Sequence, residues 1–345
     1  MNYKFTNKFF IYLIFSILIL FFSYRDFLIT YRMMLLDEYF LYYHYQNIII
    51  YYETGDQKFA DSLPMSARFF GLWLQFLVFK LIPCITLTNI EINPNYNNFF
   101  VCTTFSLALI NYIFKYLIVV LFFYYMNEIL KRPMVETLFS TIFCFIFINY
   151  IESFTFDRLV VFYTLLILAF INTRFFSIVL ILLSFLVSEK VVMVIGPLLF
   201  IKFIFLKDKT KLPQFIAAVI SVFLYFCMII YLREFQNFEF SEYYDGAGIN
   251  RILLDFTNKS HISNSILPIV FCLLPYVIFF IDKRKNNLNF SGYEFFLPII
   301  MIFLGVGGGE HNLGRYAMHT FVIWLPLLAS QLNFYFHNLI TSHEK

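Results

Sequence analysis

The sequence has few charged residues for its length. Charged side chains make up 14% of the 345 residues, hydrophobic ones make up 61%, and the mean hydropathy is +0.75. Soluble globular domains are about half apolar and about a quarter charged. Apolar stretches long enough to cross a bilayer recur from one end of the chain to the other. The sequence therefore excludes an ordinary soluble domain and predicts an all-α polytopic membrane protein, with a single integral membrane domain over residues 1–345.

Several motifs of soluble and metal-dependent enzymes are absent. The chain has no GxSxG, HExxH or paired CxxC motif, so serine hydrolase, metalloprotease and zinc enzyme chemistry has no support. Its five cysteines lie in or beside apolar segments without paired spacing, which predicts neither a disulfide framework nor a zinc site. The net charge of +3 is small and scattered, which does not indicate a nucleic acid partner. No internal repeat is visible, which weakens the usual signature of a transporter.

The positions of the cationic residues predict which loops face the cytoplasm. Lys and Arg in short loops favour the cytoplasmic side, and the strongest markers are "KDKTK" (207–211) and "DKRK" (282–285). Counting helices from these loops places the N-terminus in the cytoplasm and predicts about ten transmembrane helices. In this arrangement, segment 68–85 is an interfacial or re-entrant helix that does not cross the membrane. The loops expected on the external face are 25–67, 233–264 and 307–316.

A rival arrangement makes 68–85 a true span and fuses residues 175–206 into one long helix. This arrangement buries Glu189 and Lys190 near the middle of the membrane and moves the cations of two short loops to the outside. Intramembrane charge is costly and the loop charges are then reversed. The first arrangement is therefore preferred.

The stretch "LLDEYFLYYHYQ" (35–46) places two carboxylates among bulky apolar residues. In a helix, Asp37 and His44 share one face. One interpretation is an interfacial helix whose Tyr and His side chains sit at the depth of the lipid headgroups. The other is a reaction centre, because a carboxylate beside apolar surface has a raised proton affinity and can take a proton from a sugar hydroxyl.

Three further stretches place ionisable residues beside apolar helices. Asp157 and Arg158 open "FDRLVVFYTLL", where they are either surface residues at a helix end or part of a site. Glu189 and Lys190 interrupt "LVSEKVVMV"; such residues are functional candidates, although a mutual salt bridge also explains them. In "GGGEHNLGRY" (307–316), glycines permit close backbone approach and an arginine can bind phosphate in bidentate fashion. The candidates in this last stretch are Glu310, His311, Arg315 and Tyr316.

Together these elements resemble the GT-C superfamily, integral membrane glycosyltransferases that use polyprenyl-phosphate-linked sugars. In that family a first helix leads into an external loop that opens with an acidic pair, as at Asp37 and Glu38. A second acidic residue begins a later helix, and "FDRLVVFYTLL" is similar. A polar pair often interrupts the middle helices, as in "LVSEKVVMV". An "RY" followed by a proline-containing helix resembles "GRYAMHTFVIWLP". The resemblance spans about residues 10–335.

The resemblance implies transfer of a sugar from a polyprenyl-phosphate donor to an acceptor hydroxyl at the external face of a bacterial inner membrane. By this analogy Asp37 is the general base, Glu38 supports it, and Asp157 helps to bind the acceptor or a metal. Arg315, with Lys190 or Arg158, holds the donor phosphate. The implied substrate-binding residues are His44, Arg68, Arg158, Glu189, Lys190, Glu310, His311, Arg315 and Tyr316.

The expected partners are the lipid-linked sugar, a glycan, lipid or protein acceptor, and membrane lipids. The chain has no clear DxD motif, so no metal ligands are assigned and a divalent cation stays open as a cofactor.

Other functional classes also fit these features. A membrane polysaccharide polymerase or ligase uses lipid-linked glycans as well, and would depend on the arginines of the large loop, Arg233 and Arg251. A lipid-linked glycan transporter or flippase would move its substrate without forming a glycosidic bond. In a non-catalytic scaffold, neutralising Asp37 and Arg315 would change only the stability of the protein.

Overall fold

The computed structural model describes residues 2–36, 49–56, 68–84, 98–150, 156–236, 259–281, 293–307 and 317–343. Within these ranges every regular element is a helix, so the all-α class predicted from the sequence is confirmed for them. The main helices are α1 (Asn2–Leu36), α3 (Phe69–Leu81), α4 (Asn98–Tyr124), α5 (Met134–Phe147), α6 (Asp157–Ala169), α7 (Arg174–Leu183), α8 (Glu189–Ile204), α9 (Leu212–Gln236), α12 (Lys259–Ile281), α13 (Phe296–Gly307) and α15 (Phe321–His343).

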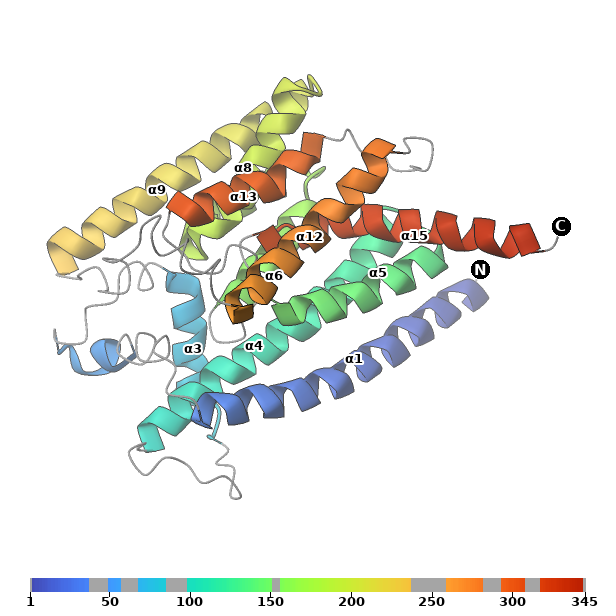
Figure 1. Cartoon of the computed structure of the whole chain (residues 1–345). Helices are drawn as coiled ribbons and strands as arrows, with labels where there is room; N and C mark the ends of the chain where they lie inside the picture. Colours follow the sequence, from blue (N-terminus) through green and yellow to red (C-terminus); the bar gives the residue numbers. More distant parts are fainter. Residues whose placement is uncertain are drawn as a thin grey trace.

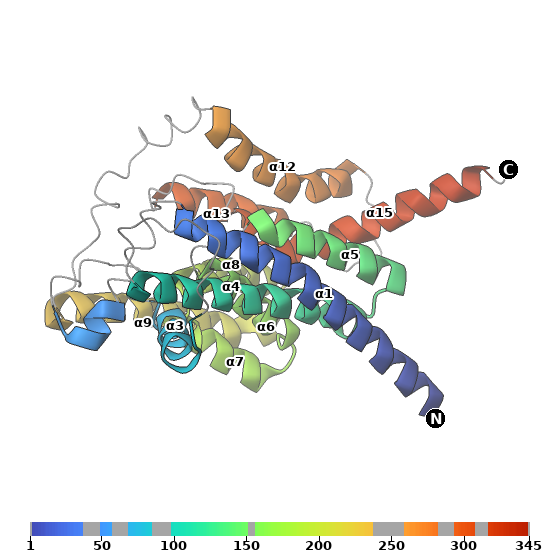
Figure 2. The same ribbon diagram turned by 90° about the horizontal axis from the view of Figure 1, so that it is seen from below.

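The helices form a bundle in which α4 is central (Figure 1). Helix α4 packs against α1, α3, α5 and α6, while α9 packs against both α7 and α8, and α15 packs against α5 and α12. The N-terminal end of α1 and the C-terminal end of α15 lie at the same end of the bundle (Figures 1 and 2).

Helix α3 lies across the direction of the long helices. In Figure 2 it is seen nearly end-on, whereas α1 and α4 run across the view. It contains 13 residues, and Gln75 on its buried side donates a 3.2 Å hydrogen bond to the Thr103 carbonyl of α4. At 1.5 Å per residue, a helix of this length is roughly 20 Å long, shorter than a ~30 Å hydrocarbon core.

Apolar side chains cover the outward faces of the long helices. On α9, Phe223, Phe226 and Phe235 are more than half exposed, and Phe21 of α1 is 71% exposed. Three described stretches are long and apolar enough to cross a membrane: Tyr12–Ile29, Val101–Ile129 and Lys209–Phe235. Exposed apolar surface on this scale marks contact with lipid or protein, and with the span lengths it indicates a membrane protein.

The segment 174–204 is two helices rather than the single long helix of the rival arrangement. Helix α7 ends at Leu183, a 3₁₀ turn follows, and α8 begins at Glu189. Between them Ser188 has an extended backbone and caps α8, because its hydroxyl accepts a 3.3 Å hydrogen bond from the Lys190 amide. The break puts Glu189 and Lys190 at a helix start instead of in a helix middle.

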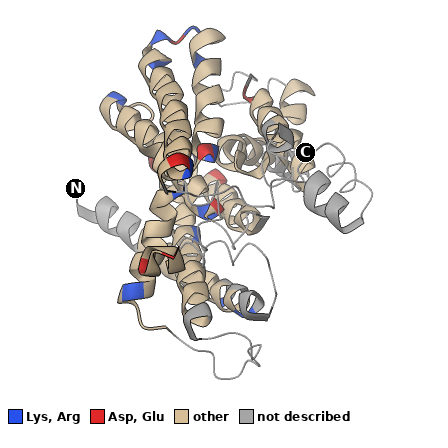
Figure 3. Ribbon diagram, turned by 90° about the vertical axis from the view of Figure 1, so that its left-hand side faces the viewer, with Lys and Arg blue, Asp and Glu red and all other residues tan. Residues whose placement is uncertain are grey.

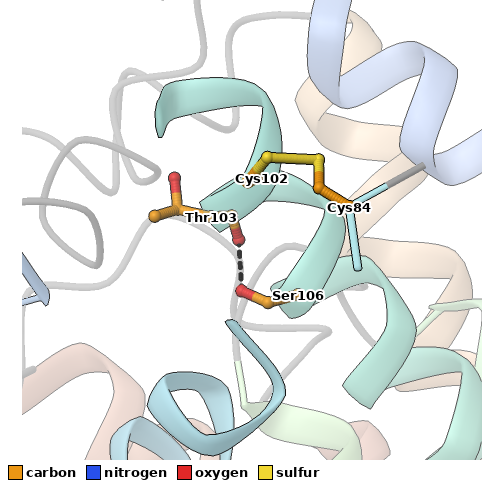
Figure 4. Close-up of a disulfide and its surroundings, with 4 residues drawn as sticks. All are labelled: Cys84, Cys102, Thr103 and Ser106. Atoms are coloured by element: carbon orange, nitrogen blue, oxygen red, sulfur yellow. Dashed lines mark hydrogen bonds between the residues drawn. A yellow bond between two sulfur atoms is a disulfide. The ribbon is translucent and has the colours of Figure 1, made fainter. Parts of the chain in front are cut away.

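One expectation about cysteine was wrong. Cys84, just beyond α3, forms a disulfide with Cys102 of α4 (Figure 4), with their Cα atoms 5.2 Å apart. The sequence spacing gave no sign of this pair, since it arises only because α3 packs against the first turns of α4. Among the described residues Cys144, Cys227 and Cys272 are free thiols.

Helix limits also differ from the expected ones. Helix α1 continues to Leu36, so the first part of the expected loop 25–67 is helical. Helix α9 continues to Gln236 and α12 begins at Lys259, which shortens the non-helical part of 233–264.

Candidate functional site

A buried ion pair joins the first turns of α6 and α8. The Lys190 Nζ lies 3.0 Å from Asp157 Oδ1, and the two side chains are 0% and 1% exposed. Both helices begin at the same end of the bundle and pack against each other. A carboxylate is favoured in the first turn of a helix because the exposed amides there are electropositive. Local sequence therefore favours Asp157 at this position, and helix packing supplies its cationic partner.

His319 completes this contact from the other end of the chain. Its Nε2 lies 3.6 Å from Asp157 Oδ1, and its side chain is fully buried. It precedes α15 within a run in which every residue from 317 to 331 is buried. The sequence analysis missed His319; the available signal was a histidine followed at once by a threonine in an otherwise apolar run.

A second ion pair ties α3 to the start of α8. Arg68, the residue before α3, lies 3.5 Å from Glu189 through Nη2 and Oε1, and it is only 3% exposed. The Ser188 hydroxyl donates a 3.0 Å hydrogen bond to Glu189 Oε2. Glu189 is thus held by an arginine on one side and by the cap of its own helix on the other.

Two more buried cations lie beside or on α4: Arg158 of α6 and Lys115 of α4 itself. Arg158 Nη1 donates a 3.4 Å hydrogen bond to the Asn111 carbonyl, and Arg158 is 3% exposed. One turn further on, Lys115 is 1% exposed, and its Nζ donates a 2.7 Å hydrogen bond to Asn149 Oδ1. The sequence analysis did not identify Lys115, because a lysine between apolar residues of a long helix carried no motif.

We call Arg68, Asp157, Arg158, Glu189, Lys190 and His319 the charged cluster. Figure 3 views the bundle from the left of Figure 1 and shows acidic and basic segments close together in its middle. Charge interactions in such apolar surroundings are stronger than in water, and charged groups that are bonded there have fixed orientations. The arrangement can orient an anionic group or a hydroxyl that reaches it.

A close contact between α3 and α6 sets the geometry beside this cluster. A Cβ added to Gly71 would lie 2.6 Å from Cγ of Phe156, the residue before Asp157. Atoms cannot approach so closely, so only glycine permits this packing distance.

We therefore expect Gly71→Ala to lower the free energy of unfolding by about 1–3 kcal/mol through overpacking, despite alanine's better helix propensity. Thermal unfolding of the purified protein in detergent measures the loss. The matched control is Gly196→Ala in α8, where the new Cβ would meet its nearest atoms at 3.9 Å. A Gly71→Ala variant as stable as Gly196→Ala would contradict the proposed contact.

The structure describes five of the predicted site residues: Arg68, Asp157, Arg158, Glu189 and Lys190. It pairs Arg68 with Glu189 and Lys190 with Asp157, and these two pairs meet at adjacent positions of α8. Arg158 follows Asp157 in α6 and bonds to the Asn111 carbonyl. The other predicted site residues lie outside the described residues: Asp37, Glu38, His44, Glu310, His311, Arg315 and Tyr316. In the chain, Asp37 follows the last residue of α1, and Arg315 precedes His319 by four positions.

No described group of three or more His, Cys, Asp or Glu side chains is arranged to hold a metal ion. Asp157 is engaged by Lys190, and Glu189 by Arg68. Each carboxylate therefore contacts a cationic side chain, and the two are not arranged around a common metal position.

Comparisons with known proteins gave no relative: no protein-family model matches the chain, and no curated protein or solved structure matches it significantly.

Proposed function

We propose that this protein is a membrane glycosyltransferase that moves a sugar from a polyprenyl-phosphate donor to an acceptor hydroxyl. The observation that carries the proposal is that Arg68, the Asp157–Arg158 pair and the Glu189–Lys190 pair lie in one largely buried cluster, linked by two ion pairs. Buried ionisable groups in an apolar bundle are costly and mark functional sites. These residues come from three separate stretches of the sequence.

In the proposed reaction Asp37 takes the proton of the acceptor hydroxyl, and the resulting oxygen attacks the anomeric carbon of the donor. The bond from that carbon to the phosphate oxygen breaks, and polyprenyl phosphate leaves with the electron pair. Arg315 and Arg158 stabilise the charge that develops on this leaving phosphate. Asp157 orients Lys190 through the buried ion pair and acts as a positioning residue.

The proposed membrane arrangement has about ten spans, with α3 at the interface and the N-terminus in the cytoplasm of a bacterial cell. The charged cluster then lies toward the external face. The Cys84–Cys102 disulfide supports this orientation, because disulfides persist in oxidising compartments. The loop 207–211 supports it from the other side, since three lysines in a short loop favour the cytoplasm.

Cysteine labelling tests this orientation. In a Cys227→Ser background, we expect Phe40→Cys and His311→Cys to react with a membrane-impermeant maleimide in intact cells. Lys209→Cys should react only after the cells are opened, because its exposed loop faces the cytoplasm. Labelling of Phe40→Cys and His311→Cys from opposite sides would reject the shared external face.

A comparison of surface glycans from cells with and without the gene tests the function. We expect one glycosidic linkage to disappear on deletion and to return with the plasmid-borne gene. Unchanged glycan structure would reject a transferase.

A proton-coupled flippase for a lipid-linked glycan is the second candidate, favoured by the fully buried contact of Asp157 with Lys190 and His319. Buried carboxylate, amine and imidazole groups in contact are typical of proton relays in transporters. A flippase would leave the linkage intact once substrate reached the outer leaflet by another route. For a polymerase or ligase, Arg251 lies outside the described residues and Arg233 is exposed beside Glu234.

A further inference from the structure

A polar cavity lies at the other end of the helices that carry the charged cluster. It has a volume of about 800 Å³, within the range of small-molecule sites. Its wall includes Leu168, near the end of α6, and Lys202, near the end of α8. Lys202 is 12 residues beyond Lys190, which places the two lysines roughly 18 Å apart along α8. The cavity is therefore separate from the charged cluster.

Three cations and two carboxylates line this cavity: Lys131, Arg132, Lys202, Asp208 and Glu294. They come from the α4–α5 connection, the end of α8, the α8–α9 loop and the 3₁₀ turn before α13. Ile129, Leu198, Ile323 and other apolar residues form the rest of the wall. Such a lining suits a ligand with both an anionic group and hydrogen-bonding groups.

The backbone around Lys131 and Arg132 is unusual. Helix α4 ends in a π-helical turn, Tyr125–Ile129, where the Leu130 amide donates a 2.9 Å hydrogen bond to the Tyr125 carbonyl. Lys131 then has a φ of +51°, in the left-handed region that non-glycine residues rarely adopt. π-Turns and such backbone positions occur frequently at functional sites. Here they direct the chain so that both cations line the cavity.

The charged side chains of the cavity are fixed by neighbours. Arg132 lies 3.8 Å from Glu136, whose other carboxylate oxygen accepts a 3.0 Å hydrogen bond from Asn333 of α15. Asp208 accepts a 3.0 Å hydrogen bond from the Thr210 amide and another from its hydroxyl. These bonds lower the pKa of the Asp208 carboxyl below its ordinary value. Glu294 is 5% exposed, so its carboxylate is held in the wall of the cavity.

We propose that this cavity binds a phosphorylated polyol, with the phosphate held by Lys131, Arg132 and Lys202. Guanidinium and ammonium groups form charge-assisted hydrogen bonds with phosphate oxygens. Asp208 and Glu294 accept hydrogen bonds from the hydroxyls of the same ligand. The ligand is either a soluble sugar phosphate or the headgroup of a phosphoinositide-type lipid, since both present this chemistry. The site does not depend on the proposed glycosyltransferase activity.

The test uses the full-length protein and two sources of the ligand. In detergent, thermal unfolding is followed while glucose 6-phosphate is added, with glucose as the uncharged control. In lipid nanodiscs, unfolding is compared between pure phosphatidylcholine and phosphatidylcholine mixed with phosphatidylinositol. We expect a saturable rise in Tm in one of these arms, because a ligand that binds the folded state raises its stability. The arm that responds identifies the source.

Lys202→Gln should raise the half-saturating ligand concentration about tenfold or more, since one charge-assisted hydrogen bond is lost. Lys209→Gln is the matched control. Lys209 is exposed in the α8–α9 loop and, unlike its neighbour Asp208, does not line the cavity. If Lys202→Gln does not fold, the exposed Lys131→Gln variant replaces it with the same expectation. No shift in either arm, or an unchanged response in the cavity variant, would overturn the proposal.

Discussion

Replacing Lys190 by methionine should lower the free energy of unfolding by about 3–5 kcal/mol, because it leaves the Asp157 carboxylate buried without this cation. The Asp157 and Lys190 side chains are at most 1% exposed, so water cannot take the place of the ammonium group. Unfolding of the purified protein in mixed micelles, titrated with a denaturing detergent, measures the change. This is the largest stability effect expected from a single side chain of the charged cluster.

A double variant separates lost pairing from lost packing. In Asp157→Leu with Lys190→Met both charges are removed, and most of the stability should return, since apolar side chains of similar volume often replace buried ion pairs without loss. The exposed control is Lys80→Met on α3. Lys80 pairs with Glu53 at the surface and is 50% exposed, so we expect a change of about 1 kcal/mol or less. Equal losses in Lys190→Met and Lys80→Met would refute the buried pair.

Asp37→Asn should reduce sugar transfer by about 10²–10⁴-fold, the contribution usually made by a general base. Asparagine keeps the shape of the side chain but cannot accept the proton of the acceptor hydroxyl. The variant should insert into the membrane and elute from gel filtration like the wild type. The measurement is incorporation of labelled sugar from a polyprenyl-phosphate donor in membranes that contain each variant.

Asp56→Asn serves as the control and should retain transfer. Asp56 lies just after the short helical stretch 49–54. Full transfer by Asp37→Asn would reject Asp37 as the base while leaving the charged cluster unaffected. Loss of membrane insertion would instead assign Asp37 a structural role. If both Asp37→Asn and deletion of the gene leave the glycans unchanged, the transferase itself is wrong.

Some residues of the site were predictable because their signal is local. An ionisable pair within an apolar stretch is visible in the sequence, as at Asp157–Arg158 and at Glu189–Lys190. The sequence left open whether Glu189 pairs with Lys190 or belongs to a larger site. The structure pairs each with a different partner: Glu189 with Arg68, and Lys190 with Asp157.

Other features carried little or no local signal. His319 and Lys115 each stand among apolar residues that any buried helix would contain. Cys84 and Cys102 are 18 residues apart, a spacing without meaning until α3 packs against α4. The cavity at the far end of α8 depends on a π-turn, and neither composition nor helical periodicity predicts one.

By itself, the amino-acid sequence determined that the chain is helical and apolar, with segments long enough to cross a membrane. Hydropathy can be read from each segment separately, so this conclusion needs no knowledge of how the helices pack. It also marked the ionisable pairs Asp157–Arg158 and Glu189–Lys190 within apolar stretches. Only the tertiary structure decided which charges meet, since Asp157 and Lys190 are 33 positions apart and Arg68 and Glu189 are 121 apart. Buried charges are tolerated only where an opposite charge lies within about 4 Å. Here helix packing, and not any single segment, brings the opposite charges that close.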